Sequence, residues 1–254
     1  MDLRANALLL VVVSTLLQGF ALLGLLPISD GTPGKIWFGH AEMLLIALLL
    51  LNGWFIRYRV IATGQDALTQ SVATLCFLSL LVCAGGDFVN RNYFGIYHGH
   101  DSAIRHSYLA DSVWLFAPGY ALFLWATVKT ARFHGVGRGF IAVCALVAGA
   151  LGALSFIDLY TPEAGGYVST MTGGYAVFIS IVGVSSVWLV KALGWRIAYP
   201  VAIGAVMATV ADALIGNFWI YREGFYPAIS HVNWILYFAS QALVQQFPLQ
   251  LSRS

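Results

Sequence analysis

Five acidic residues fall inside long apolar stretches of this chain and are its best candidates for chemistry: Glu42, Asp87, Asp111, Asp158 and Asp212. A carboxylate at the centre of a bilayer costs about 2.5–3.5 kcal/mol on insertion scales, so such a group should face a polar cavity or a partner. Three of the five lie near the ends of their stretches, where hydration or a structural hydrogen bond accounts for them equally well. Asp87 and Asp212 are therefore the main candidates for catalysis.

The surroundings of Asp87 and Asp212 favour close approach by another group. Asp87 follows Gly85 and Gly86, and Asp212 follows Ala211. Both aspartates lie near the same end of their stretches, which places them at similar depth if each stretch spans a membrane. One protonated and one ionised carboxyl at matched depth can act as general acid and general base. Such a catalytic pair requires the two side chains to meet in the fold.

The composition indicates what kind of chain must position these acids. Of its 254 residues, 59% are apolar and 9% are charged, whereas soluble domains carry about 25% charged residues. These values exclude a soluble globular enzyme, a disordered chain and a disulfide-rich secreted domain. The net charge of +2 is too small to indicate a nucleic-acid partner. Three cysteines without a CxxC pair predict neither a disulfide framework nor a thiolate metal site.

Continuous apolar runs predict helices and argue against a membrane β-barrel, whose strands alternate. A helical span needs about 20 apolar residues. The sequence predicts an all-α, polytopic integral membrane protein with eight transmembrane helices in one bundle, forming a single domain over residues 1–254. Small residues at 148–153 and 173–174 predict close helix packing. The expected spans are 6–27, 36–57, 68–90, 108–130, 137–158, 168–191, 197–219 and 229–248.

The basic residues predict the orientation of this bundle. Cytoplasmic loops carry an excess of Lys and Arg, and eight spans place both termini on one side. The terminal side has nine such residues and the other side has four, Lys35, Arg91, Arg105 and Arg222. We therefore expect a multi-pass protein of the cell membrane with both termini cytoplasmic. The nine are Arg4, Arg57, Arg59, Lys129, Arg132, Arg138, Lys191, Arg196 and Arg253.

The histidines offer an alternative to the aspartate pair. The sequence has His98-Gly99-His100 followed by His106, and His40 and His231 fall on the same predicted side. Imidazoles with an aspartate suit zinc, which would make the chain a metal-dependent membrane lipid amidase or hydrolase. A His-x-His in a Gly- and Tyr-rich loop is more often simply hydrated.

A further alternative is a non-enzymatic transporter or sensor module. It requires a polar path through the inner half of the bundle, where the predicted spans contain few polar residues. A relay made of the acids alone would stop halfway across the membrane.

Four short segments share their pattern with a known family. Residues 204–215, GAVMATVADALI, lead through small residues to Asp212, and the last predicted span contains Tyr237-Phe238-Ala239-Ser240-Gln241. Gly86-Asp87 and the stretch 175–180 match two further positions. Together these segments resemble the YhhN-type lysoplasmalogenase family, of which this chain would be a divergent member. The family's eight spans agree with the number expected here.

The resemblance implies hydrolysis of the vinyl-ether bond of lysoplasmalogens, which yields a fatty aldehyde and glycerophosphoethanolamine or glycerophosphocholine. The family's two aspartates match Asp87 and Asp212, and no cofactor or metal is implied. One carboxyl would protonate the alkene carbon, and the other would help water add to the resulting oxocarbenium ion. The expected partner is a lysophospholipid in the bilayer. The residues expected to contact the substrate or water are Tyr237, Gln241, Asn217, Asp111 and Glu42.

The chain also departs from the family pattern. Its outer segment at 91–107 is long and rich in His, Tyr and Asn, and Pro118-Gly119-Tyr120 stands where members often have Gly-His. These departures allow a relative that keeps the fold and acts on a different substrate.

Overall fold

The computed structural model describes residues 2–28, 32–92, 96, 99–100, 102–104, 106–222 and 228–252, apart from the Trp219 side chain. Within these residues the chain is helical and forms no strand. The elements are α1 (Leu3–Leu22), α2 (Pro33–Ala62), α3 (Ala67–Arg91), η1 (Ser107–Ser112), α4 (Val113–Phe133), α5 (Arg138–Ile157), η2 (Pro162–Ala164), α6 (Gly166–Leu193), α7 (Trp195–Leu214), the π-helical η3 (Ile215–Ile220), α8 (Ile229–Val244) and α9 (Phe247–Leu251).

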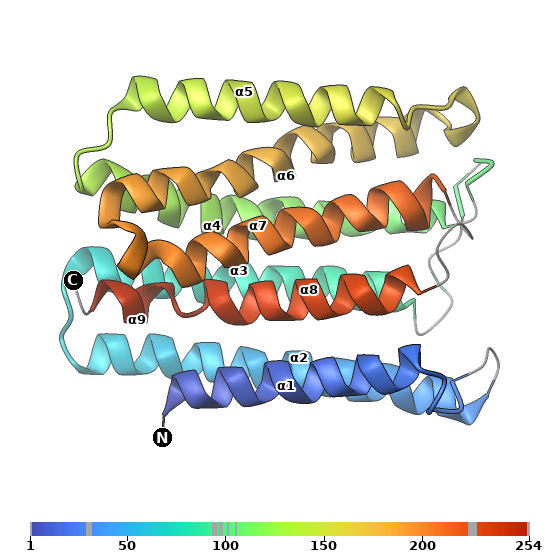
Figure 1. Cartoon of the computed structure of the whole chain (residues 1–254), viewed down its shortest axis with the longest axis horizontal. Coiled ribbons are helices and arrows are strands. Elements are labelled where there is room, and N and C mark those ends of the chain that lie inside the picture. The colour runs from blue at the N-terminus through green and yellow to red at the C-terminus, as the bar shows by residue number, and fades with distance from the viewer. Residues whose placement is uncertain are drawn as a thin grey trace.

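Successive long helices run in opposite directions and form a bundle (Figure 1). Both ends of the described chain lie at the same end of the bundle, which we call the terminus end. The connections α1–α2, α3–α4, α5–α6 and α7–α8 lie at the opposite end, the long-loop end. The main apolar core draws on every long helix except α5, which packs chiefly on α6 at the edge of the bundle.

Seven helical segments in the described part of the chain are long and apolar enough to cross a membrane. The predicted eighth span, 229–248, corresponds to α8, whose 16 residues extend about 24 Å against a hydrocarbon core of about 30 Å. After a break at 245–246, α9 continues α8 toward the terminus end (Figure 1). The first helix ends at Leu22, before the predicted limit of 27, because Gly24 turns the chain with φ of 69°.

The long helices expose many large apolar side chains on the surface of the bundle. On α5, side chains such as Leu146, Leu154 and Ile157 are at least 60% exposed. A soluble protein would place polar residues at such positions, so these helices suit a lipid environment.

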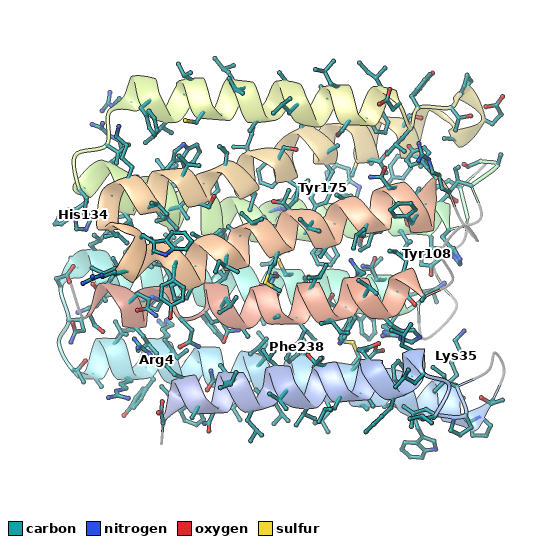
Figure 2. All side chains as sticks on the ribbon, viewed as in Figure 1. Arg4, Lys35, Tyr108, His134, Tyr175 and Phe238 are labelled. Carbon is teal, nitrogen blue, oxygen red and sulfur yellow. The ribbon has the colours of Figure 1, made fainter. Side chains whose placement is uncertain are left out.

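The uneven distribution of basic residues follows the two ends of the bundle. Eight of the nine residues expected on the terminal side lie in elements or turns at the terminus end, and Arg253 lies outside the described residues. Of the other four, Lys35, Arg91 and Arg222 lie at the long-loop end, and Arg105 is not described. In Figure 2, Arg4 and His134 lie toward one end of the bundle and Lys35 and Tyr108 toward the other.

Asp66 is at the terminus end and has a structural role. Its Oδ1 accepts the backbone N–H groups of Leu68 at 2.9 Å and Thr69 at 3.0 Å, and its Oδ2 accepts the Thr69 hydroxyl at 2.7 Å. These bonds satisfy the free N–H groups at the start of α3. They also favour the ionised form, so the Thr69 hydroxyl and backbone hold the pKa of Asp66 below its ordinary value. Asp2 caps α1 through the backbone N–H groups of Arg4 and Ala5.

The small-residue stretch at 148–153 allows α5 to lie directly on α6. A Cβ atom at Gly152 would lie 2.5 Å from the carbonyl oxygen of Ala176 and 2.6 Å from Oγ of Ser180. No real side chain tolerates the first contact, because a backbone oxygen cannot move aside. Gly174, in the second predicted stretch, has no atom within 4 Å of such a Cβ, so only part of the predicted close packing is observed.

We therefore expect Gly152→Ala to destabilise the folded bundle by about 1–3 kcal/mol, the usual effect of overpacking. The matched control is Gly174→Ala, which should leave stability unchanged or raise it by up to about 1 kcal/mol through helix propensity. Unfolding of both variants in detergent, followed by circular dichroism, measures the difference. Equal stability of the two variants would contradict the close contact between α5 and α6.

Candidate functional site

Asp87 and Asp212 come together inside the long-loop half of the bundle. Asp87 lies on α3 and is 3% exposed, and Asp212 lies on α7 and is 9% exposed. The two carboxyls lie close enough to interact electrostatically, and both also interact with the buried Cys83. Both aspartates therefore lie in one buried polar region, and their action as an acid and a base stays a prediction.

Each aspartate is held by a tyrosine from another helix. The hydroxyl of Tyr237 on α8 donates to Oδ2 of Asp87 at 2.8 Å, and that of Tyr175 on α6 donates to Oδ2 of Asp212 at 2.8 Å. Tyr175 lies where α6 and α7 run side by side (Figure 2). A buried carboxyl without such a donor would be costly, so these bonds fix the orientation of both groups.

Gln241 and Tyr120 extend this polar cluster. Nε2 of Gln241 on α8 donates to the Tyr120 hydroxyl on α4 at 3.1 Å, and Tyr120 interacts electrostatically with both aspartates. The sequence directed attention to Gln241 and Tyr237. Tyr120 was noted only as a departure from the family pattern, yet it lies beside the aspartates.

The backbone of α7 changes from α-helical to π-helical geometry shortly after Asp212. Nδ2 of Asn233 donates to the carbonyl oxygen of Ala211 at 2.6 Å, and the helix widens to a π-helix from Ile215 to Ile220. Such π-turns free backbone groups and are frequent at functional sites. Here the widened turn lines one wall of a cavity beside Asp212.

This cavity measures about 100 Å³ and lies between η1, α4, α5, α6, α7 and η3. Asp212, Tyr175 and Asn217 line it, whereas Asp87, Tyr237 and Gln241 do not. Nδ2 of Asn217 donates to the carbonyl oxygen of Ala213 at 2.8 Å within its own helix. Of the two aspartates, Asp212 is therefore the one that faces the cavity.

Glu42 belongs to a second buried cluster, on the α1–α2 side. It forms an ion pair with Arg91 and accepts a hydrogen bond from Nε2 of Gln18. The Gln18 amide oxygen accepts in turn from Nδ1 of His231 at 2.7 Å. The Arg91 guanidinium also lies over the Trp234 ring, 5.2 Å from its centroid. Glu42 does not line the cavity; these contacts join α1, α2, α3 and α8.

One face of α8 links the two clusters. His231 contacts Gln18, Trp234 lies beneath Arg91, and Tyr237 holds Asp87, all at spacings of three residues. The rings of Trp234 and Tyr237 are 6.0 Å apart. On α3, Arg91 follows Asp87 by one helical turn. A displacement of Arg91 would therefore shift Asp87 through α3, which carries both residues, and through α8, which contacts both.

Asp111 lies at the long-loop end, outside the cavity lining. Its Oδ1 accepts the Tyr167 hydroxyl at 2.7 Å and lies 2.8 Å from Nε2 of His100. Nε1 of Trp114 donates to the Tyr167 hydroxyl at 3.1 Å. These contacts tie the α3–α4 connection to the start of α6, which is a structural role. Asp158, the other acid of this group, is exposed at the end of α5.

The described histidines are dispersed. His100 pairs with Asp111, His231 with Gln18, and His40 packs against Trp37. In the part of the chain that the structure describes, no three His, Cys, Asp or Glu side chains are placed to hold a metal ion. His98 lies outside that part.

Breaking the Glu42 cluster from one side should destabilise the fold. Glu42→Leu leaves Arg91 and Gln18 without their partner, and we expect a loss of about 2–3 kcal/mol in unfolding free energy, below the usual figure for a fully buried pair because Arg91 is partly exposed. Glu42→Leu combined with Arg91→Leu should recover part of that loss, since no unpaired charge remains. Denaturation in detergent measures both.

Glu163→Leu is the matched control, because Glu163 is exposed in the α5–α6 turn and its loss should change stability by no more than about 0.5 kcal/mol. If Glu42→Leu were as stable as this control, the ion pair would not hold the helices together.

Comparisons of the chain with protein-family models, curated proteins and solved structures find no match.

Proposed function

We propose that this chain is an intramembrane hydrolase that cleaves the vinyl-ether bond of lysoplasmalogens by aspartate acid–base catalysis. The observation that carries the proposal is the buried pair of Asp87 and Asp212, each held by a tyrosine, with Asp212 open to a cavity. The motif resemblance around both residues points to the same reaction. The expected products are a fatty aldehyde and glycerophosphoethanolamine or glycerophosphocholine.

Vinyl-ether hydrolysis needs one carboxylic acid and one carboxylate. The acid transfers its proton to the alkene carbon two bonds from the ether oxygen, and the alkene electron pair forms the new C–H bond. The product of this step is an oxocarbenium ion, which a carboxylate stabilises electrostatically. Asp212 lines the cavity, so its carboxyl is the one proposed to contact the reacting atoms.

Water completes the reaction. The carboxylate accepts one proton as water adds to the carbon attached to the ether oxygen, which gives a hemiacetal. That hemiacetal then loses its hydroxyl proton, the glycerol oxygen gains one, and the bond between the carbon and the glycerol oxygen breaks. One water is consumed and both carboxyls return to their starting forms. The electrostatic interaction between Asp87 and Asp212 supports their acting as one coupled pair in these steps.

The proposal includes the orientation of the protein. In it, α8 and α9 together complete an eighth span, both termini face the cytoplasm, and the site lies in the outer half of the cell membrane. The excess of basic residues at the terminus end supports this arrangement. A lysolipid could then keep its single tail in lipid while the reacting bond enters the polar cavity.

A transporter is the alternative that one observation favours. Asn52 and Gln245 are buried in the terminus half, and their amide groups have no hydrogen-bond partner among the described residues. Buried amides of this kind usually bind water, which would extend polarity beyond the aspartates. Solute uptake by proteoliposomes, unaffected by loss of lipid hydrolysis, would favour this function.

The hydrolase proposal predicts that Asp87→Asn and Asp212→Asn each lower aldehyde release from lysoplasmalogen by about 100-fold or more, the usual scale for loss of a general acid or base. Both variants should fold, because an amide oxygen can still accept the tyrosine hydroxyl. The measurement uses purified full-length protein in detergent, with the aldehyde trapped and quantified by mass spectrometry.

Asp158→Asn is the control, since it removes an exposed carboxyl outside the cavity and should retain wild-type activity. Activity equal to wild type in both aspartate variants would reject the mechanism. Hydrolysis of no lysolipid by the wild-type protein, with transport present, would move the assignment to the alternative.

A further inference from the structure

Within the described part of the chain, the cavity beside Asp212 is lined by one acidic residue and by no basic residue. Among the described residues that line it, Asp212 is the only charged one, and none is Lys, Arg or His. Apart from the Asn217 amide, the rest of the lining is apolar, hydroxyl-bearing or aromatic, and it includes the rings of Phe116, Phe156, Tyr175 and Tyr221. A cavity of this kind repels anions and favours a cation through the carboxylate and the ring faces.

One carboxylate oxygen of Asp212 is available to accept a hydrogen bond from a ligand. Its Oδ2 accepts the Tyr175 hydroxyl, while its Oδ1 accepts no hydrogen bond from any residue that the structure describes. The side chain is only 9% exposed, so bulk water satisfies it poorly. A carboxylate oxygen in this position is a strong acceptor for a charged N–H donor in the cavity.

Three of the side chains that line the cavity contact one another. The Tyr221 hydroxyl is hydrogen-bonded to the Thr172 hydroxyl at 2.7 Å, and the centroids of the Tyr221 and Phe156 rings are 5.9 Å apart. The volume of about 100 Å³ holds a small head group and no second chain. Ser155 and Phe156 of the cavity wall sit on α5, beside the exposed Leu154 and Ile157, where an alkyl tail can reach lipid.

We propose that this cavity is a cation site that binds the protonated amine of a single-chain amphiphile, with the ammonium group on Oδ1 of Asp212 and the tail directed past α5. The binding itself does not depend on catalysis. Its consequence rests on the proposed hydrolase function: a protonated amine at this position carries the charge of the oxocarbenium ion, and it therefore inhibits vinyl-ether hydrolysis competitively.

The test compares three ligands of equal chain length, dodecylamine, dodecanol and dodecyl sulfate, on the full-length protein in neutral nanodiscs at neutral pH. We expect dodecylamine to bind at least about tenfold more tightly than dodecanol, equivalent to about 1.4 kcal/mol, and dodecyl sulfate to bind more weakly than dodecanol. Asp212→Asn should abolish the preference for the amine, and Asp158→Asn should retain it. Titration calorimetry measures the affinities.

Equal affinity of amine and alcohol for the wild-type protein overturns the proposal, and so does an amine preference that persists in Asp212→Asn. Aldehyde release from lysoplasmalogen, measured with and without dodecylamine, separates this proposal from the proposed function. Amine-selective binding without any lysoplasmalogen hydrolysis supports the cation site and rejects the hydrolase. Hydrolysis without amine selectivity rejects the cation site alone.

Discussion

Burial of carboxyl groups among apolar helices is the constraint on which this structure depends. A carboxyl removed from water must find hydrogen-bond donors or a counter-charge inside the protein. Three acids of the bundle face this requirement and meet it differently. Glu42 takes an arginine and a glutamine, whereas Asp87 and Asp212 each take one tyrosine hydroxyl. A neutral donor leaves the aspartates their capacity for proton transfer, which a full ion pair would remove.

The two clusters follow one another along one face of the same helix, α8. Its face toward α1 and α3 carries His231 and Trp234 in the Glu42 cluster, and one or two turns later it carries Tyr237 and Gln241 in the aspartate cluster. The ion-paired Glu42 cluster thus holds the helix that orients Asp87. This division explains how a short helix at the end of the chain comes to be so thoroughly buried.

Hydropathy predicted the helices well because a helix that is apolar on its outer surface as well as in the core appears in the sequence as a long apolar run. The ends of the helices were less predictable: Gly24 stops α1 early, and the break before α9 divides the last span. Asp87 and Asp212 could be selected as acids beside small residues, whereas nothing in the sequence pointed to a contact of Tyr175 or Tyr120 with a carboxyl. Tyr175 and Tyr120 also follow glycines, but tyrosine is common in membrane helices for packing, so only the fold tells which hydroxyls meet a carboxyl. The same holds for Arg91, which the sequence presents as an ordinary helix-end base.

The histidines show the opposite case, in which a sequence pattern suggested a metal site but the described residues of the pattern make separate polar contacts. His100 and His231 each satisfy one neighbouring polar side chain, Asp111 and Gln18. Spacing in the sequence brings such residues near one another only along a single helix or loop, whereas a site in a bundle collects residues from several helices. The aspartate site takes its groups from α3, α4, α6, α7 and α8. A chain with so little charge can support a polar site in this way because a few carboxyls, each contributed by a different helix, converge where the apolar packing is opened by a widened turn.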